Sequence, residues 1–563
     1  MKTHMIKNII RDVPRLRAIY ANVAVLATAA ALPLLVPSGL RAADYTSTRL
    51  ANGTVLTLDS DDTVTTTGTS LSAQNGGSIA ISPVNGSIAV TRTNNTSGYS
   101  VDANGSGSRI NMGINSSVIS GAGGIRAQSD ATVTANAISI TGGSEITPIS
   151  ANNIRGASAA SGGQLSLGSN STIKMYVGDE ATNVAGIYGT GSGTNITVTD
   201  HLQVEIVGGF IPPSGYTNMA RGVSVSDGAV VDWGTNANIK VLDGIGISVS
   251  SANSSTTVGT GAYVEANAAI HGTSGTMTAT DGIFRGVGTN GAGIIVSQGF
   301  NVTLTDSDVY GERTGIVVVS NTASDSGLPA SVTISGGTTT SGTGALIRSS
   351  SSNETLYSTE MTVTFKDGAQ AVGGSGVFYE TGMLPTAGSA ASIIVQGAGT
   401  NAVGVFLDDG ANLISTLTVS DGATWSSVGS SNMDNLILDE ANVLLTLDSL
   451  SDTITAGDTL TLTGANSVTV GLTNDFLAAV LADSTYYDLD TNALITGSTL
   501  DGTGSLGYTV LDHNDAGSTW TVTDLGSGWV RIGDISAVPE PGTYAALAGL
   551  AIMAYAVIVR RRR

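Results

Sequence analysis

The sequence Ala292-Gly-Ile-Ile-Val-Ser-Gln-Gly-Phe-Asn-Val-Thr-Leu-Thr305 contains two short runs of aliphatic and β-branched residues, separated by a glycine. Runs of this length and composition, bounded by glycine, predict β-strands. No amphipathic helical pattern of comparable length interrupts them, so the sequence predicts an all-β fold. Similar runs occur at residues 195–199, 245–249, 315–319, 331–335, 392–395 and 413–419.

A glycine followed by two or three aliphatic residues recurs at intervals along the chain. Successive intervals are 24, 47, 22, 29, 32 and 28 residues, and we expect the interval of 47 to span two repeats. Repeats of this length without helices predict a right-handed parallel β-helix, in which each coil contributes about three short strands. The pattern occurs at Gly222, Gly246, Gly293, Gly315, Gly344, Gly376 and Gly404.

The expected boundaries of the β-helix follow from this pattern. The body spans residues 44–430, and we expect no break over 120–430 and a less regular segment before residue 120. An array of β-sandwich domains is the structural alternative, but it requires sharper boundaries than the chain has. The 74 glycines could also indicate disorder by composition, which the strand pattern contradicts.

The end of the body carries a more specific motif. Gly422-Ala-Thr-Trp425 is followed by Leu436-Ile-Leu438, and later by Gly457-Asp-Thr-Leu460. These segments resemble the end of pertactin-type autotransporter passengers, which implies that residues 431–537 finish and cap the β-helix. Autotransporters then continue into a membrane barrel of roughly 250 residues. Only 26 residues follow Ala537, so we expect a different export route.

The C-terminal tail, residues 538–563, combines a proline motif, an apolar run and four arginines. The prolines of Val538-Pro-Glu-Pro541 disfavour helix and leave an extended, protease-accessible peptide. Residues 544–559 carry no charge and would form a helix of roughly 24 Å, close to the ~30 Å core of a bilayer. The sequence therefore predicts a transmembrane helix, with the C-terminal arginines retained in the cytoplasm. These arginines are Arg560, Arg561, Arg562 and Arg563.

This order of parts resembles the PEP-CTERM sorting signal of Gram-negative bacteria that make an extracellular polymeric matrix. The resemblance implies that an exosortase-type membrane protease processes the chain near Pro539, Glu540 and Pro541, while the chain is held in the inner membrane. The mature body would then reach the cell surface or the extracellular matrix. An ordinary membrane anchor with a chance proline motif is the alternative.

The N-terminal 43 residues have the pattern of a secretory signal peptide. An apolar stretch at residues 21–36 is followed by small residues over 37–43, which predicts export through the Sec translocon and cleavage after Ala42 or Ala43. A retained signal anchor is the alternative. The basic residues that precede the apolar stretch are Lys2, Lys7, Arg11, Arg15 and Arg17.

The composition of the mature body, residues 44–537, excludes several classes of function. It contains 13 basic and 42 acidic residues, a net charge of about −29, which repels nucleic acid. The chain has no cysteine, so no disulfide holds it together. Extracellular polysaccharide remains a candidate partner, with divalent cations bridging any acidic polymer.

Enzymatic and metal-binding motifs are weak. Inverting glycosidases need carboxylates roughly 6.5–9.5 Å apart, but the Gly-His-Gly and Arg-Ile-Lys companions typical of pectinases do not occur. Calcium-binding β-roll and EF-hand patterns are also missing, so no metal or cofactor is predicted. The acidic and histidine candidates are Asp408 with Asp409, Asp306 with Asp308, the group Asp59, Asp61 and Asp62, and His201, His271 and His513.

The sequence as a whole predicts an exported, acidic, non-enzymatic β-helical protein of the cell envelope or extracellular matrix, with a structural or adhesive role. A polysaccharide-degrading or modifying enzyme on the same scaffold is the alternative.

Overall fold

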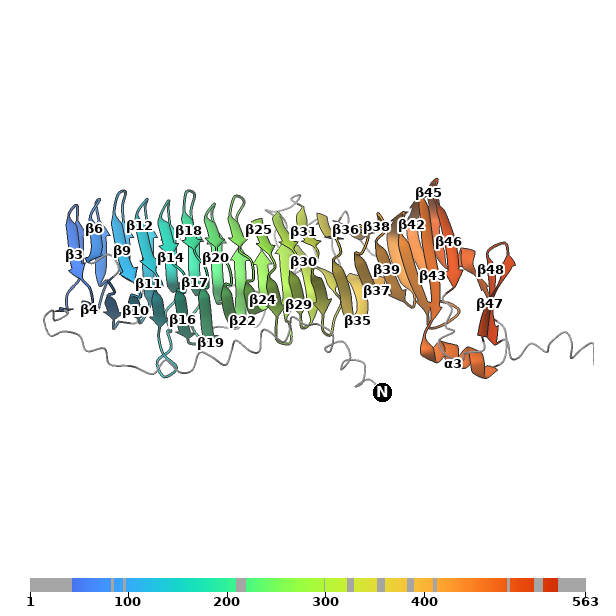
Figure 1. Cartoon of the computed structure of the whole chain (residues 1–563), viewed down its shortest axis with the longest axis horizontal. Coiled ribbons are helices and arrows are strands. Elements are labelled where there is room, and N and C mark those ends of the chain that lie inside the picture. Colours follow the sequence, from blue (N-terminus) through green and yellow to red (C-terminus); the bar gives the residue numbers. More distant parts are fainter. Residues whose placement is uncertain are drawn as a thin grey trace, which may run out of the picture. The chain divides into compact units, whose positions relative to one another are not determined.

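The structure, a computed structural model, describes most of the predicted body (Figure 1). All described residues belong to one compact unit. The predicted signal peptide up to Ala42 and the tail beyond residue 534 lie outside the described residues. The described ranges are 43–82, 86–94, 98–208, 219–297, 299–320, 329–351, 360–381, 389–408, 413–483, 487–510 and 520–534.

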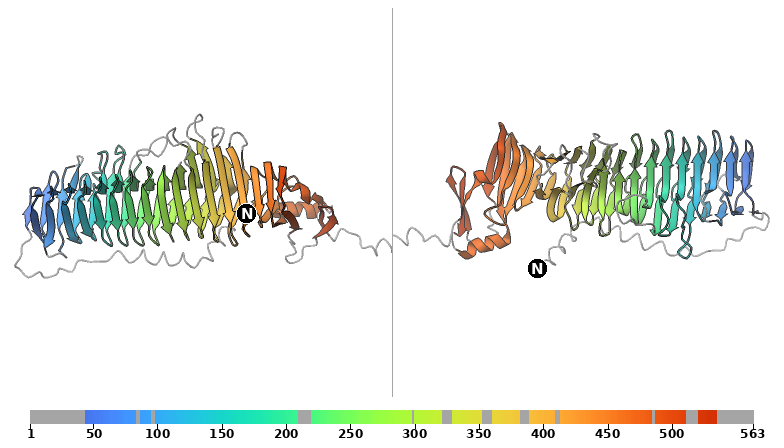
Figure 2. Two further views of the ribbon diagram at one scale, coloured as in Figure 1. Left: turned by 90° about the horizontal axis from the view of Figure 1, so that it is seen from above. Right: turned by 180° about the vertical axis from the view of Figure 1, so that it is seen from behind.

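Nearly all described elements are strands, and 45 of them join one parallel sheet that winds along the chain. The first three strands are β1 (Asp44–Tyr45), β2 (Arg49–Asn52) and β3 (Val55–Asp59), and they pair in parallel with β4, β5 and β6. Three strands therefore make one coil, and each coil stacks on the previous one (Figures 1 and 2). The expected all-β fold with a parallel solenoid is confirmed. Its right-handed sense stays a prediction from the handedness of parallel crossovers.

The paired strands form three long faces, and seven strands bend around a corner from one face into the next. Face 1 contains β1, β4 (Thr63–Thr66), β7 (Ala89–Arg92), β10 (Ser117–Ser120), β13 (Ser139–Gly142), β16 (Thr172–Val177), β19 (Gln203–Gly208), the first parts of β22 (Asn238–Val249), β24 (Tyr263–Gly272), β35 (Gln370–Thr381) and β37 (Asn401–Leu407), and β26 (Ile283–Gly286), β29 (Asp308–Gly311), β32 (Thr338–Ser341), β39 (Thr424–Val428), β41 (Asn442–Leu447), β43 (Ala465–Leu472) and β46 (Ser505–Val510).

Face 2 contains β2, β5 (Leu71–Gln74), β8 (Tyr99–Asn104), β11 (Gly123–Gln128), β14 (Arg155–Ala160), β17 (Ala185–Thr190), β20 (Arg221–Ser226), the later parts of β22, β24, β35 and β37, β27 (Ala292–Ser297), β30 (Thr314–Ser320), β33 (Ile347–Ser351), and the first parts of β40 (Ser431–Asp439), β42 (Ile454–Thr463) and β45 (Ile495–Gly502).

Face 3 contains β3, β6 (Ser78–Ser82), β9 (Arg109–Ile114), β12 (Thr132–Asn136), β15 (Gln164–Leu167), β18 (Asn195–Val198), β21 (Val230–Trp233), β23 (Ser255–Val258), β25 (Gly275–Thr280), β28 (Phe300–Thr305), β31 (Ala330–Ser335), β34 (Glu360–Lys366), β36 (Ser389–Gln396), β38 (Leu413–Ser420) and the later parts of β40, β42 and β45.

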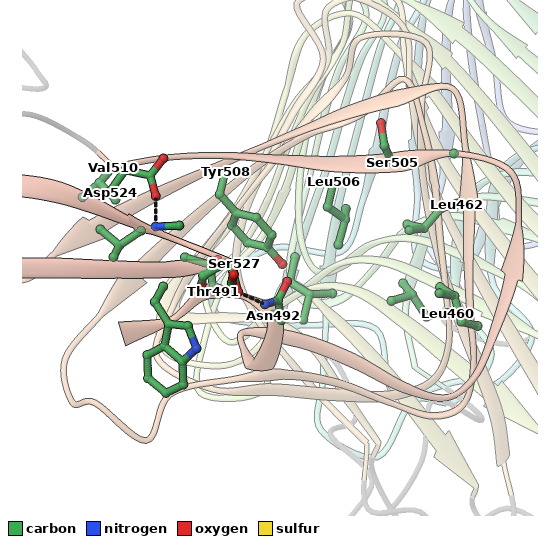
Figure 3. A pocket seen from close by; sticks show the side chains of 17 residues that line it. Leu460, Leu462, Thr491, Asn492, Ser505, Leu506, Tyr508, Val510, Asp524 and Ser527 are labelled. Carbon is green, nitrogen blue, oxygen red and sulfur yellow. Dashed lines mark hydrogen bonds between the residues drawn. The ribbon is translucent and has the colours of Figure 1, made fainter. Parts of the chain in front are cut away.

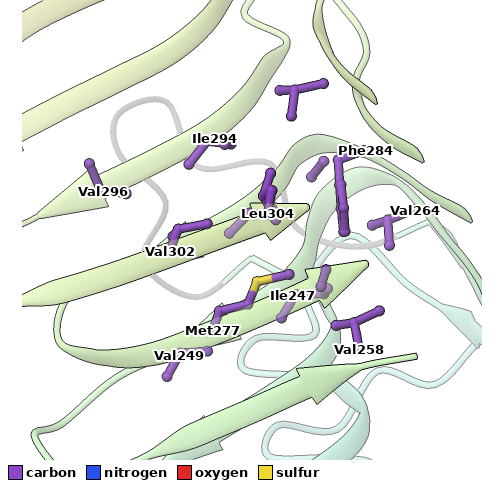
Figure 4. Packing of buried hydrophobic residues seen from close by; sticks show 14 of the residues in the cluster. Ile247, Val249, Val258, Val264, Met277, Phe284, Ile294, Val296, Val302 and Leu304 are labelled. Carbon is purple, nitrogen blue, oxygen red and sulfur yellow. The ribbon is translucent and has the colours of Figure 1, made fainter. Parts of the chain in front are cut away.

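The core is a continuous stack of inward-facing aliphatic side chains (Figure 4). On face 2, Ile247 pairs with Ile270, Ile270 with Ile294, and Ile294 with Ile316, and all four are fully buried. Parallel pairing places such residues about 4.8 Å apart along the stack, so each side chain packs on the same position of the next coil. Burial of apolar area in these columns is the main favourable contribution to folding.

The glycines of the repeat lie where face 2 approaches a side chain of face 1. A Cβ atom at Gly222 would lie 2.3 Å from Ile239 Cγ2, and one at Gly246 would lie 2.3 Å from Val264 Cγ1. Glycine is therefore required by packing at these positions. The interval of 47 residues does contain two coils, as expected, because Ala269 occupies the intermediate position opposite Gly246.

The repeat loses its register after Gly315. Ile316 pairs with Ile347, and Ile347 pairs with Tyr379, which places Leu346 and Phe378 in the glycine column. Gly344 and Gly376 are thus two residues out of register with the earlier glycines. These glycines therefore do not all mark the same point of a coil, because the residues that pair between coils, rather than the glycines, define the repeat.

Two further expectations concern the turns and the N-terminal coils. Polar residues with positive φ do form the tight turns, for example Asn170 (φ 62°) and Asn236 (φ 56°), consistent with the tolerance of Asn for this conformation. The expected irregularity of residues 44–120 is wrong. There, β4 pairs with β7 and β5 with β8 in the same order as later coils, since alternating buried residues such as Val64 and Val90 already fill the core.

Buried hydroxyl groups connect the turns of successive coils. Thr194 Oγ1 accepts a hydrogen bond from the backbone N–H of Gly162 (3.0 Å) and donates to the carbonyl of Thr190 (2.8 Å). The hydroxyl group thus provides an acceptor for a turn N–H group that has no partner in the pairing of parallel strands. Ser108, Ser254 and Thr400 accept from turn glycines in the same way.

The coil stack continues past residue 430 to β45 and β46, and a small antiparallel sheet follows. That sheet contains β44 (Tyr487–Asp490), β47 (Trp520–Gly526) and β48 (Trp529–Asp534), and its neighbours in the chain are α3 (Asn474–Asp483) and the 3-10 helix η2 (Thr491–Ala493). Trp425 is fully buried in β39, where its indole N–H donates to the carbonyl of Gly404 (3.0 Å). Gly457 and Asp458 lie at the register shift between Ala456 and Thr459, where β42 bends from face 2 into face 3.

We expect Gly246→Ala to destabilise the body by about 2 kcal/mol, because the added methyl group must displace Val264. Gly68→Ala is the matched control, since a Cβ atom there meets no atom within 4 Å and the backbone has no positive φ. Chemical denaturation followed by circular dichroism measures both effects. Equal midpoints for the two variants would contradict the packing role of the glycine column.

Candidate functional site

The residues predicted for sorting lie outside the described part of the chain. These residues are Val538, Pro539, Glu540, Pro541, Arg560, Arg561, Arg562 and Arg563. Among the described residues, no helix is both long and apolar enough to cross a membrane.

Two of the three acidic candidates stabilise turns. Asp62 is buried and accepts hydrogen bonds from the backbone N–H groups of Ala43 (2.8 Å) and Asp59 (3.0 Å). Asp308 Oδ1 accepts from the backbone N–H of Thr338 (2.9 Å), and Asp306 has a positive φ of 48°. The short spacing of these acids in the sequence therefore reflects turn geometry, in which Asp caps exposed N–H groups.

The third candidate belongs to a cluster of carboxyl groups at the corner between faces 2 and 3. Asp408 is nearly buried and accepts hydrogen bonds from Thr381 Oγ1 (2.9 Å) and Ser415 Oγ. Asp434 Oδ2 accepts from the backbone N–H of Ser415 (2.8 Å). Burial raises the pKa of Asp434, and the nearby carboxyl groups of Asp408 and Asp458 raise it further. Asp409, predicted as the partner of Asp408, lies outside the described residues.

This carboxyl cluster can share or hold a proton, as closely spaced carboxylates do. Sequence reasoning missed Asp434 and Asp458, because the pairing of β37 with β40 and of β40 with β42 brings them to the same corner as Asp408. Within the described ranges, no group of three or more histidine or acidic side chains is arranged to hold a metal ion.

We expect Asp434→Asn to gain stability relative to the wild type between about pH 4 and pH 7. A carboxyl group whose pKa is raised by folding stabilises the protein while protonated, and that contribution is lost as the pH rises through the raised pKa. The asparagine stays neutral and retains an oxygen acceptor for the N–H of Ser415. Thermal unfolding at several pH values measures the difference. Asp243→Asn, at an exposed position, is the control, and a pH-independent difference for Asp434→Asn would contradict the argument.

The two described histidine candidates, His201 and His271, lie on different coils and do not join the carboxyl cluster. His201 occupies a turn with φ 59° between β18 and β19, next to Asp200, which accepts from the backbone N–H of Thr235 (2.8 Å). His271 lies in β24, where burial, and to a lesser extent the charge of Arg221, lowers its pKa to about 4. His271 is therefore neutral at physiological pH. His513 lies outside the described residues.

Face 1 carries an outward column of alternating charges, which we call the charged ladder. Each member pairs in register with the next, so the side chains project side by side from successive coils. Lys174 Nζ lies 2.9 Å from Glu205 Oε2, and Lys240 Nζ lies 3.4 Å from Glu265 Oε1. The charged ladder consists of Lys174, Glu205, Lys240, Glu265, Arg285 and Tyr310.

Tyrosines flank the charged ladder. Tyr263 donates its hydroxyl hydrogen to Glu265 Oε2 (2.5 Å), and Arg285 lies 5.5 Å from the ring centroid of Tyr310. Burial alone would raise the pKa of Glu265, but the Tyr263 hydroxyl and the two flanking cations lower it overall. Glu265 is therefore an ionised centre that holds two cations and a phenol in fixed positions.

The charged ladder differs from the acidic remainder of the body in two ways. Its three cations and two anions nearly balance, whereas the mature body carries about −29. Next to it, Tyr176 pairs with Val207, which is 39% exposed. Leu242, which follows Val241 on the next coil, is 47% exposed. Sequence reasoning missed this surface because its members are 20 to 35 residues apart at irregular intervals, and only the strand register aligns them.

A cavity of about 700 Å³ lies between the last coil and the antiparallel sheet (Figure 3). Leu460, Leu462 and Leu506 line one side of it, with Tyr508 in the middle and Trp529 on the side of β48. Burial and the charge of Asp490 raise the pKa of Tyr508 to about 12, so this phenol stays protonated. The cavity lies at the end of the aliphatic core, where no other strand of the described residues pairs with β46 beyond β43.

Comparison with known proteins identifies one segment. Residues 537–563 match the family described as the PEP-CTERM protein-sorting motif. No curated protein matches the chain. The motif confirms the predicted sorting signal and makes this chain an exported exosortase substrate, synthesised as a membrane-anchored precursor.

Proposed function

We propose that this protein is a non-enzymatic structural or adhesive component of the cell envelope or extracellular matrix, and that the charged ladder on its β-helix contacts extracellular polysaccharide. The observation that carries the proposal is the sorting motif at residues 537–563, attached to a long, continuously paired β-helix. A signal peptide removed after Sec export and exosortase cleavage near Pro539-Glu-Pro541 belong to the proposal.

The charged ladder supports polysaccharide as the partner. Sugar rings present apolar faces and many hydroxyl groups, and aromatic side chains beside fixed charges can contact both kinds of surface. Tyr263 and Tyr310 supply the rings, while Lys240 and Arg285 supply donors held by Glu265. The balanced charge also removes the repulsion that the rest of the body would impose on an acidic polymer.

The carboxyl cluster favours the alternative, an enzyme that cleaves polysaccharide. Glycosidases need two carboxyl groups with different protonation states, and Asp434 has a raised pKa beside Asp408. Against this alternative, Asp408 and Asp434 both direct oxygens at Ser415, as expected for a corner that links strands. Release of reducing ends from matrix polysaccharide by the wild type, abolished in Asp434→Asn, would support the enzyme.

Replacement of Pro539, Glu540 and Pro541 by alanine should leave an unprocessed chain in the membrane, because the apolar run and its arginines still stop transfer. Mass spectrometry of the wild-type exported fraction should detect the body and no peptide from residues 544–559. Cells that lack the exosortase are the control for processing. Persistence of the full tail in wild-type cells with active exosortase would show that it is an ordinary anchor.

The double variant Tyr263→Ala, Tyr310→Ala should bind purified matrix polysaccharide at least tenfold more weakly than the wild type, since two aromatic contacts are lost. Isothermal titration calorimetry or co-sedimentation measures this change. Lys366→Ala is the control, because Lys366 is exposed on face 3, away from the charged ladder. Unchanged binding by the tyrosine variant would exclude the ladder as the contact surface.

A further inference from the structure

The first described residue, Ala43, is attached to the second coil by both of its backbone groups. Its N–H donates to Asp62 Oδ1 (2.8 Å), and its carbonyl accepts from the backbone N–H of Thr63 (2.9 Å). The next residue, Asp44, begins β1 and pairs with Thr63 in parallel. Both backbone groups of Ala43 therefore join the body.

Asp62 is an unusual acceptor for this N–H group. The residue is 1% exposed, and its two oxygens accept from backbone N–H groups of Ala43 and Asp59. No lysine, arginine or histidine of the described ranges forms an ion pair with it. Buried carboxylates are rarely left without a cation, because the loss of hydration is costly.

We infer that the leader is cleaved between Ala42 and Ala43, and that the α-ammonium group created at Ala43 forms a partly buried ion pair with Asp62. The inference rests on export, which is part of the proposed function. In the hydrolysis, water supplies OH to the acyl carbon of Ala42 and H to the nitrogen of Ala43 as the C–N bond breaks. The new amine then takes one proton from solvent and becomes the cation that Asp62 lacks.

Cleavage one residue later would remove both attachments. Loss of Ala43 deletes the donor to Asp62 Oδ1 and the acceptor for the N–H of Thr63. The sequence also favours the earlier bond. Signal peptidases prefer small residues one and three positions before the cut, and the third position holds Leu40 for the earlier bond but the charged Arg41 for the later one.

The ion pair would be absent from the precursor, in which the nitrogen of Ala43 is a neutral amide. Cleavage converts a hydrogen bond between an amide and a carboxylate into a charged pair at a partly buried site, which is stronger. The pair would fasten β1, the two-residue strand at the start of the β-helix, to the adjacent coil. Removal of the leader would thus stabilise the first coil.

Sequencing of the N-terminus of the exported protein tests the cleavage site. The expected first residues are Ala43-Asp-Tyr-Thr. A chain that starts at Asp44, at any other residue, or at an intact leader overturns the inference. Fractionation of the same cells keeps the two proposals distinct, because exported protein with another N-terminus leaves the proposed function standing, whereas protein confined to the cytoplasm contradicts that function.

Titration of the α-amino group in the mature protein tests the ion pair. The group can be labelled by reductive ¹³C-methylation and followed by NMR. Its midpoint should lie above the ordinary value near 8 by on the order of one unit, and should return toward that value in Asp62→Asn. Asp61→Asn is the matched control, because Asp61 is exposed and accepts from Ser87 Oγ. A wild-type midpoint at or below 8 overturns the ion pair, even if Asp62→Asn fails to fold.

Discussion

The structure depends on the in-register stacking of coils around a core only a few side chains wide. Each coil is hydrogen-bonded to the coils before and after it, so a residue that points inward must fit against the residues at the same position in both neighbours. One column meets this requirement by repeating the same residue in four coils: Ile247, Ile270, Ile294 and Ile316. The glycine column meets it by leaving room for the aliphatic side chains of face 1.

The same register organises the outer surface. Side chains at matching positions of successive coils become neighbours, however many residues separate them in the chain. The charged ladder arises in this way on face 1, and the carboxyl cluster arises at the corner between faces 2 and 3. The charged ladder produces a nearly neutral surface on an acidic protein. The carboxyl cluster concentrates acidic groups in a partly buried corner. Together with the sorting motif, they connect the fold to a role outside the cell.

Much of the fold could be predicted because its signals are local. Short β-branched runs between glycines predicted the strands, and the interval of 47 residues was correctly divided into two coils. The likeness to autotransporter passengers stays a prediction, as does the right-handed sense. The sorting motif was predicted from its three parts and is confirmed by the family match.

The candidate site could not be predicted, because it depends on register. Turns that vary in length separate Lys174 from Glu205 by 31 residues and Glu265 from Arg285 by only 20, so no fixed spacing reveals the charged ladder. Asp59 with Asp61 and Asp306 with Asp308 were conspicuous in the sequence, yet they serve turns. Asp434 was not conspicuous, yet the pKa of its carboxyl group is raised. Gly344 and Gly376 also match the sequence pattern of the repeat, yet strand register places them outside the glycine column.

The direction of the hydrogen bonds has a mechanical consequence. Strands run across the stack, so the bonds between coils point along its axis, and tension along that axis is shared by all the bonds of each interface. The body then yields at its thinnest interface. At the junction of β37 and β40 on face 2, only one residue pair is described, that of Leu407 with Asn432, beside Asp408. Under axial tension the β-helix would part first at this point, and both halves would keep intact coils.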